Sequence, residues 1–430
     1  MPASTLASSP TAFLEWRKQA GIHVYGTSDP ILDLSQSNSI TQLLNTITAL
    51  PAWTNDANSA AYQSVKWEQL HSLRNEFIGA QLPEPSVQIS AEDSQALERS
   101  LPVILETCYS LNKIAEYAGL RPNEATWRLP CDTLISHTFR MGQGDLPLMY
   151  LNECELSLPE TGPTFPSTAT ADACLFFRRT RLFETPTPEN APLANEAACF
   201  NVSAWPNLYI LQWACEHNGE QEGQYRLIMD LTSAQYQRRS LGIDNDVVYG
   251  AHAVRGVMHI YASWWHSKQI KCKKLLELDL KRPRPAVQFY MFLRKVLSHA
   301  NSNQSTFEGL SEHKLRTAQA AYKGSWKAER QAGDLHDAFS GSPLSSDGGR
   351  SDVQQEDDES MKSTTTSTEQ EEGEEGRTES SMQEDVISDG GRRSVSPTAA
   401  ELDRVKRQRL DHWTGTPPTV VEWIQKSESA

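Results

Sequence analysis

The hydrophobic pattern of the chain changes its period near Ala171, and this change constrains the possible folds more than any other feature. Before it, the stretch "AEDSQALERSLPVILETCYSLNKIAEYAGL" repeats apolar residues at spacings of three and four, which predicts a helix. After it, "ADACLFFRRTRLF" and "LYILQWACE" are short apolar runs, which are typical of strands in a buried sheet. The remaining predicted elements are a helix at 222–242, a hairpin that turns near Arg255–Gly256, a strand at 271–280 and a helix opened by Pro285. This order predicts an α/β fold in which helices pack on a mixed sheet.

Composition divides the 430 residues into three parts. Residues 1–90 show weak helical periodicity. They either pack on the core or form an accessory helical lobe, and the sequence does not decide between the two. Residues 91–305 hold the α/β elements, and residues 306–430 form a tail. Within the tail, residues 341–400 contain no aromatic residue and carry 15 Asp or Glu against 5 Lys or Arg. Such a segment buries too little apolar surface to offset the entropy of ordering, so we expect it to be disordered.

Charge and cysteine usage narrow the class of protein. The net charge is −15, of which residues 341–400 supply −10, so the rest of the chain is nearly neutral and any binding of nucleic acid needs a local patch. The seven cysteines include no CxxC pair, which favours reduced, buried thiols in an intracellular protein over a disulfide framework. No apolar run approaches the 18 residues of a membrane span, so we expect no membrane partner.

Three polar residues occupy positions from which they could act together. Asp172 begins the first predicted sheet strand, and Glu216 ends the second. Because side chains alternate along a strand, we expect Glu216 on the same face as Ile210, Gln212 and Ala214. Gln224 lies on the inner face of the helix that follows. Two carboxylates at adjacent strand ends provide the oxygen ligands that Mg²⁺ prefers, and such a metal activates water and stabilises charge on a phosphate.

Four segments, taken in order, resemble the PD-(D/E)XK nuclease-like (restriction-endonuclease-like) domain found in many fungal proteins. "NEATW" resembles a helix motif of that family, and "FPSTATADACLFF" resembles the segment that leads to its metal-binding Asp. "FNVSAWPNLYILQWACEHN" is similar to the lead into the strand that carries (D/E)xK. "EGQYRLIMDLTSAQYQRRSLG" resembles the Gln-bearing helix that follows, and "VVYGAHAVRGVMHIYASWW" fits the later strands. The resemblance covers roughly residues 95–300 and implies a restriction-endonuclease-like fold.

The resemblance also implies a set of site residues. Glu124 matches the helix carboxylate, Asp172 and Glu216 match the ligands of a Mg²⁺ ion, and Gln224 matches the helix glutamine. The lysine of the family falls at position 218, where this chain has Asn218, which can hydrogen-bond but carries no charge. The implied activity is Mg²⁺-dependent hydrolysis of phosphodiester bonds in nucleic acid. The alternatives are an inactive module of the same fold that binds nucleic acid or protein, and an interaction scaffold of unrelated fold.

Basic residues near the C-terminus predict a nuclear location. Two clusters, "RR" and "KRQR", are separated by a spacer of residues 394–405, a pattern that an import receptor can read. The five basic residues are Arg392, Arg393, Lys406, Arg407 and Arg409. Ser394 and Ser396 adjoin the first cluster, and their phosphorylation would weaken the basic signal. A cytoplasmic protein with a solvated basic stretch is the alternative. The segment "KQIKCKKLLELDLKRPRP" is open between contacting phosphates and forming a solvated strand edge.

Overall fold

The computed structural model describes most of the first 322 residues. The described residues are 1–26, 29, 34–79, 89–116, 122–142, 146–180, 182, 191–200, 207–217, 219–243, 246–266, 268–322 and 326. Asn218, the predicted disordered segment and the two basic clusters lie outside these residues, so the expectations about them stay predictions.

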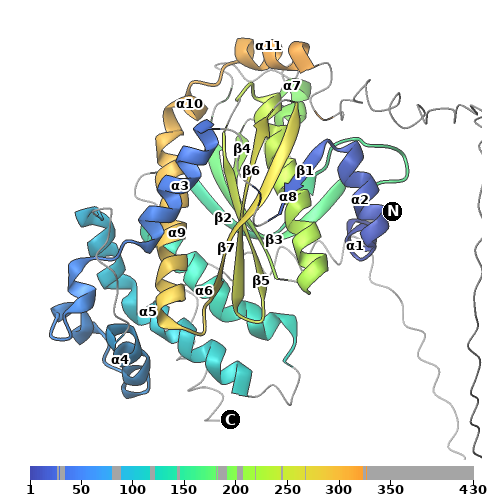
Figure 1. Cartoon of the computed structure of the whole chain (residues 1–430). Coiled ribbons are helices and arrows are strands. Elements are labelled where there is room, and N and C mark those ends of the chain that lie inside the picture. Colours follow the sequence, from blue (N-terminus) through green and yellow to red (C-terminus); the bar gives the residue numbers. More distant parts are fainter. Residues whose placement is uncertain are drawn as a thin grey trace, which may run out of the picture. The chain divides into compact units, whose positions relative to one another are not determined.

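In this part of the chain, seven strands form one mixed sheet in the order β1-β7-β6-β5-β4-β3-β2 (Figure 1). Their bounds are β1 Ile22–Tyr25, β2 Leu148–Ser157, β3 Thr168–Arg179, β4 Leu208–Glu216, β5 Val248–Val254, β6 Val257–His266 and β7 Gln269–Asp279. The pairs β1·β7 and β4·β5 are parallel, and the other neighbours are antiparallel. The predicted α/β class with a mixed sheet flanked by helices is confirmed.

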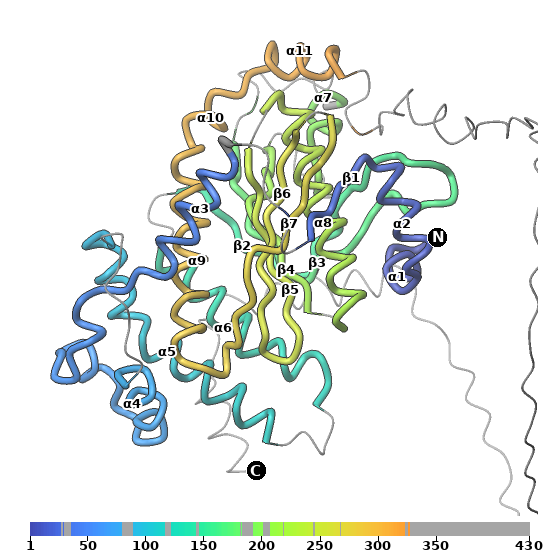
Figure 2. The backbone as a smooth tube through the Cα atoms, viewed as in Figure 1, coloured from blue at the N-terminus to red at the C-terminus, as the bar shows by residue number. Residues whose placement is uncertain are grey.

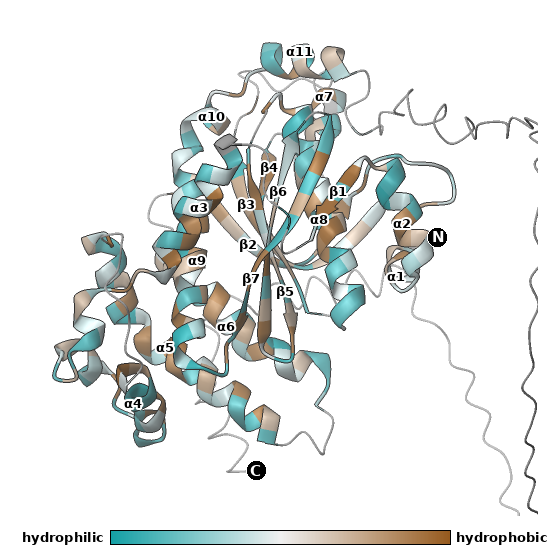
Figure 3. Ribbon diagram, viewed as in Figure 1, coloured by the Kyte–Doolittle hydropathy of each residue, from teal (hydrophilic) through white to brown (hydrophobic). Residues whose placement is uncertain are grey.

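Helices cover both faces of this sheet. The α-helices are α1 Ala3–Ala7, α2 Pro10–Gln19, α3 Leu34–Thr48, α4 His71–Gly79, α5 Ala91–Glu116, α6 Glu124–Gly142, α7 Ala191–Ala197, α8 Glu220–Ser240, α9 Pro283–Ser302, α10 Gln304–Glu308 and α11 Glu312–Tyr322. Three short 3₁₀ turns are η1 Ala52–Asn55, η2 Ala60–Ser64 and η3 Glu68–Leu70. Helices α3, α5, α6 and α9 pack on one face, and α8 with α1 and α2 packs on the other (Figures 1 and 2). Colouring by hydropathy shows brown residues on the strands and on part of α8 (Figure 3).

Local signals in the sequence explain where several elements begin and turn. Asn123 caps α6, because its side-chain oxygen accepts the Thr126 N–H at 2.9 Å. The hairpin β5–β6 turns at Arg255 and Gly256, whose φ angles of 49° and 82° are those of a two-residue turn with left-handed backbone. A proline inside a helix normally kinks or breaks it, but α5 runs without a break through Pro102.

The prediction that Ile210 shares a face of the sheet with Glu216 is wrong, because β4 contains a bulge. The register between β3 and β4 pairs Leu175 with Trp213 but Phe176 with Leu211, so Gln212 is the extra residue. An extra residue reverses the alternation of side chains. Ile210 therefore packs on the face of α9, whereas Ala214 packs on the face of α8. The α8 face is consequently the one that Glu216 shares with Ala214.

Two strands were not predicted from the sequence, and both extend the sheet at its edges. β1 adds four residues beside β7, and β2 adds ten beside β3. The pattern of β2 is interrupted at Glu153, which has a φ angle of 54° and is skipped in the register with β3. Because α1 and α2 pack into the core on the α8 side, and α3 and α4 into the core on the α9 side, the N-terminal residues belong to the same compact unit as the sheet.

All seven cysteines are buried free thiols, as the sequence predicts. Cys108, Cys131 and Cys215 lie in the core under α5, α6 and α9. The other four lie in the core on the α8 side of the sheet. No helix among the described residues is long and apolar enough to cross a membrane.

Candidate functional site

Asp172 and Glu216 face each other across the antiparallel pair β3·β4. The register places Ala173 beside Cys215, so Asp172 lies beside the last residue of β4. The backbone N–H of Asp172 donates to Glu216 Oε1 at 3.1 Å, and the backbone N–H of His217 donates to Asp172 Oδ2 at 2.7 Å. The two carboxylates named from the sequence are thus brought together by the sheet itself.

Arg128 supplies a positive charge to this pair from helix α6. Its Nη1 lies 3.3 Å from Asp172 Oδ1, and its Nη2 donates to the backbone carbonyl of Asp172 at 2.6 Å. Its Nε donates to Asp132 Oδ2 at 2.7 Å, one helical turn further along α6. The guanidinium therefore ties the N-terminal half of α6 to β3. Sequence reasoning missed Arg128, although it follows the quoted motif "NEATW" directly.

His217 lies on the opposite side of β4 from Glu216, as expected from strand alternation. Its Nε2 lies 3.2 Å from Asp132 Oδ1 and 3.5 Å from Cys215 Sγ. Burial by itself raises the pKa of Asp132, but the hydrogen bond from His217 and the charge of Arg128 outweigh it and lower that pKa. Asp132 is thus an ionised link between Arg128 and His217.

Asp230, in the middle of α8, is the residue that completes the cluster and that the sequence analysis did not name. It is fully buried, as is Glu216. No N–H or O–H group of the described residues donates to either of its carboxyl oxygens. Two ionised carboxylates buried beside each other would repel, so one of the two carboxyls, Asp230 or Glu216, holds a proton. Burial, with the charges of the neighbouring acids, raises the pKa of both groups well above the usual range.

The other predicted site residues lie around this cluster at different distances from it. Glu124 opens α6, and burial together with the charge of Asp172 raises its pKa, which places it in the electrostatic field of the cluster. Gln224 is partly exposed on α8, and its six-residue separation from Asp230 puts the two side chains on different sides of the helix. Arg226 carries an ion pair of 2.7 Å with Glu222 and acts electrostatically on Asp230. Asn218 lies outside the described residues.

The cluster holds more carboxyl groups than basic side chains. Asp172, Glu216 and Asp230 form the centre, and the guanidinium of Arg128 contacts only the first of them. A buried carboxyl pair without a cation holds a proton at neutral pH, and it can exchange that proton for a divalent ion that prefers oxygen ligands. Within the described ranges, no group of three or more His, Cys, Asp or Glu side chains has a metal-binding arrangement. The cluster can thus bind a proton, and it offers carboxylate oxygens to an incoming cation.

No protein-family model matches the chain, and no curated protein matches it either.

Proposed function

We propose that residues 91–305 form a divergent PD-(D/E)XK nuclease-like domain. The order of the elements that carry the resembling segments supports this. Helix α6 carries "NEATW", β3 carries Asp172, β4 ends on Glu216, α8 follows, and β5–β6 is the hairpin. The two strands that bear the acids are neighbours in the sheet, as a shared metal site requires.

The activity that we propose for this domain is Mg²⁺-dependent hydrolysis of phosphodiester bonds in nucleic acid. The observation that carries it is the buried Glu216–Asp230 carboxyl pair, which lies beside Asp172 and whose two pKa values burial and the neighbouring acids raise. When bound, the ion would activate water and stabilise charge on the phosphate. Asp172 and Glu216 would hold it through carboxylate oxygens, with Asp230 beneath them. Glu124, with its raised pKa, is suited to hold a proton near Asp172.

Arg128 favours a second candidate function, a module of this fold that binds nucleic acid or protein in the nucleus without catalysis. Both oxygens of Asp172 already have partners, since Oδ1 contacts the guanidinium and Oδ2 accepts the His217 N–H. To bind a metal ion, Asp172 thus has to give up its ion pair with Arg128. Such an exchange costs free energy, because the Arg128 charge then loses a partner in a partly buried position.

Calorimetric titration of the whole chain with Mn²⁺ separates the two candidates. We expect binding whose affinity rises between pH about 6 and pH about 8, because the ion displaces a proton from the Glu216–Asp230 pair. The measured heat should change with the ionisation enthalpy of the buffer by an amount that reports the released proton. Glu216→Gln should abolish the binding, whereas the exposed acid variant Glu277→Gln should leave it unchanged.

A nuclease assay on single- and double-stranded DNA then tests catalysis. If Mn²⁺ binds, we expect Asn218→Lys to raise cleavage, because a cation would return to the position of the family's lysine. A folded chain that binds no Mn²⁺ at either pH would contradict the metal-dependent activity and leave the non-catalytic module as the function.

A further inference from the structure

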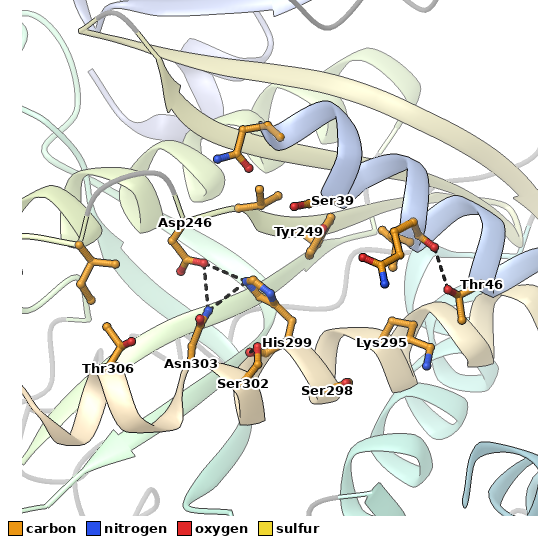
Figure 4. A pocket seen from close by; sticks show the side chains of 15 residues that line it. Ser39, Thr46, Asp246, Tyr249, Lys295, Ser298, His299, Ser302, Asn303 and Thr306 are labelled. Carbon is orange, nitrogen blue, oxygen red and sulfur yellow. Dashed lines mark hydrogen bonds and ion pairs between the residues drawn. The ribbon is translucent and has the colours of Figure 1, made fainter. Parts of the chain in front are cut away.

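A cavity of about 670 Å³ lies between α3, α9 and the start of β5, away from the acid cluster (Figure 4). It opens on the α9 side of the sheet near Tyr249, the second residue of β5. Glu216 instead points to the α8 side, and its neighbour in the sheet is His252, further along β5. The cavity is therefore a separate feature, and its volume falls in the range of small-molecule sites.

The two helix faces that line this cavity are polar, which is unusual for helices that pack together. Neighbouring helices normally bury apolar stripes against each other. Here α3 presents Ser39 and Thr46, and α9 presents Ser298 and Ser302. Amide and hydroxyl groups from Gln36, Gln42, Asn303 and Thr306 continue the lining. A concave surface of hydroxyls and amides fits a ligand with many hydrogen-bonding groups.

A buried network fixes the imidazole of His299 inside the cavity. Arg238 Nε donates to Asp246 Oδ2 at 2.6 Å, and Asp246 Oδ1 lies 2.9 Å from His299 Nε2. Asn303 Nδ2 lies 3.0 Å from Asp246 Oδ1 and 3.1 Å from His299 Nε2 (Figure 4). Burial alone raises the pKa of Asp246, but the adjacent Arg238 guanidinium and the His299 contact lower it far below the usual value. Asp246 is therefore ionised and favours the tautomer with the proton on Nε2.

This network has a consequence for the other ring nitrogen. No hydrogen bond within the described residues engages His299 Nδ1, and the ring lies among the residues that line the cavity (Figure 4). In the neutral imidazole with Nε2 protonated, Nδ1 is an acceptor for a ligand O–H or N–H group. A buried ion pair contributes little to stability against an apolar replacement. The buried Arg238–Asp246 ion pair instead has a role in holding the imidazole of His299 in a fixed orientation.

The charges around the cavity are balanced. Arg238 neutralises Asp246, and Lys295 Nζ lies 2.8 Å from Asp93 Oδ2. Neither a cationic nor an anionic ligand therefore finds an unpaired counter-charge among these groups. Leu43, Ile243 and Val247 add a small apolar area to the lining, which suits the C–H face of a polyol.

We propose that this cavity binds a small neutral carbohydrate, of a size up to a disaccharide, with His299 accepting a hydrogen bond from one of its hydroxyl groups. Hydroxyl and amide side chains of α3 and α9 contact the other hydroxyl groups.

Saturation-transfer NMR with the whole chain tests this inference. The probes are glucose, mannose, galactose, maltose, cellobiose and trehalose, each offered alone, with glucose 6-phosphate and uridine as the charged and the nucleoside comparison. We expect transfer to at least one neutral sugar. Ser302→Leu, at an exposed position of α9, should reduce that transfer by about tenfold because the larger side chain enters the cavity, whereas the Ser302 hydroxyl donates to the backbone carbonyl of His299 and not to the side chains around Asp246.

Two further variants separate recognition from folding. His299→Gln keeps a side chain that can donate to Asp246 but removes the Nδ1 acceptor, so it should weaken transfer while the melting temperature changes little. His313→Gln, an exposed histidine of α11, should behave like the wild type. The inference is overturned if no neutral sugar shows transfer, if Ser302→Leu leaves the transfer intact, or if uridine or glucose 6-phosphate is the preferred probe.

Discussion

At the scale of single residues, the Glu216–Asp230 pair makes the stability of the protein depend on pH. Both carboxyls have a raised pKa in the folded chain, so the folded state binds more protons than the unfolded state above a pH of about 4.5. The free energy of unfolding therefore falls as the pH rises through this range, by up to about 1.4 kcal/mol per pH unit for each proton.

Asp230→Asn should flatten this dependence. The amide can donate to Glu216, which then ionises without a buried carboxylate beside it, so the variant should lose less stability between pH about 5 and pH about 8. Urea unfolding at a series of pH values measures the slope for the variant, the wild type and the exposed acid control Glu277→Gln. Equal slopes in all three chains would show that the pair does not share a proton.

Arg128 has the opposite electrostatic role, because it stabilises ionised acids. Arg128→Gln removes the ion pairs with Asp132 and Asp172, whose side chains are largely buried, so we expect a loss of about 2–3 kcal/mol at neutral pH. The loss should shrink at acid pH as those carboxyls become protonated. Arg226→Gln, which removes an ion pair with the more exposed Glu222, should cost less than about 1 kcal/mol. Denaturant unfolding compares the two, and equal losses would contradict the central position of Arg128.

Much of the candidate site, but not all of it, could be predicted at this scale. Asp172 and Glu216 stand at recognisable strand positions, and their opposition follows once β3 and β4 pair. Asp230 could not be found, because a carboxylate inside a helix is normally solvated, and its burial results from the packing of α8 against the sheet, where it meets Glu216. Arg128 could not be paired with Asp172 either, since 44 residues separate them and only the packing of α6 brings them together.

At the scale of elements, α8 is held close to the sheet by a glycine. A Cβ atom on Gly250 of β5 would lie 2.7 Å from Leu227 Cδ1 and 3.1 Å from the carbonyl oxygen of Ala214. Helix α8 therefore packs against bare backbone at this point.

Gly250→Ala should destabilise the protein by about 1–3 kcal/mol, because the helix or the strand must shift. Gly79→Ala is the matched control, since nothing lies within 4 Å of its added Cβ, and it should change stability by less than about 0.5 kcal/mol. Chemical denaturation gives both values. A loss no larger than that of the control would mean that α8 accommodates the methyl group freely.

The elements themselves differ in how well the sequence predicts them. β4 is a short apolar run, α8 ends before Gly242 and the β5–β6 hairpin has a turn signal, and the structure has all three close to the expected residues. β2 has Asn152 and Glu153 in its centre, and its backbone twists at the latter, so alternation fails there. The bulge at Gln212 also could not be predicted from the sequence, because a buried glutamine cannot be told from any other polar residue that interrupts a strand.

At the scale of the whole molecule, the first 26 residues complete the core on the α8 side. Phe13 stacks on Tyr225 of α8 with ring centroids 3.9 Å apart, and Trp16 is fully buried. Tyr236 Oη donates to the backbone carbonyl of Ala20 at 3.2 Å. The resembling segments alone therefore leave a large apolar surface of α8 uncovered.

We expect a chain truncated to residues 91–305 to aggregate or to melt at a much lower temperature than residues 1–330. Removal of the N-terminal residues exposes the apolar side chains that pack against α8, and it removes β1 from the edge of the sheet beside β7. Size-exclusion chromatography and thermal unfolding of the two truncated chains make the comparison. A monomeric 91–305 chain with an unchanged melting temperature would show that this segment folds independently.

The seven buried cysteines can report when each side of the sheet opens to solvent. Burial raises the pKa of Cys131, Cys199 and Cys272 to about 12, so their thiols resist alkylation while the surrounding core is closed. Each thiol becomes reactive only when its own layer opens, and the seven sit on both sides of the sheet. The mass gained at each cysteine during a timed pulse of iodoacetamide would therefore report the order in which the helices on the two faces of the sheet separate from the strands. The experiment needs no engineered cysteine.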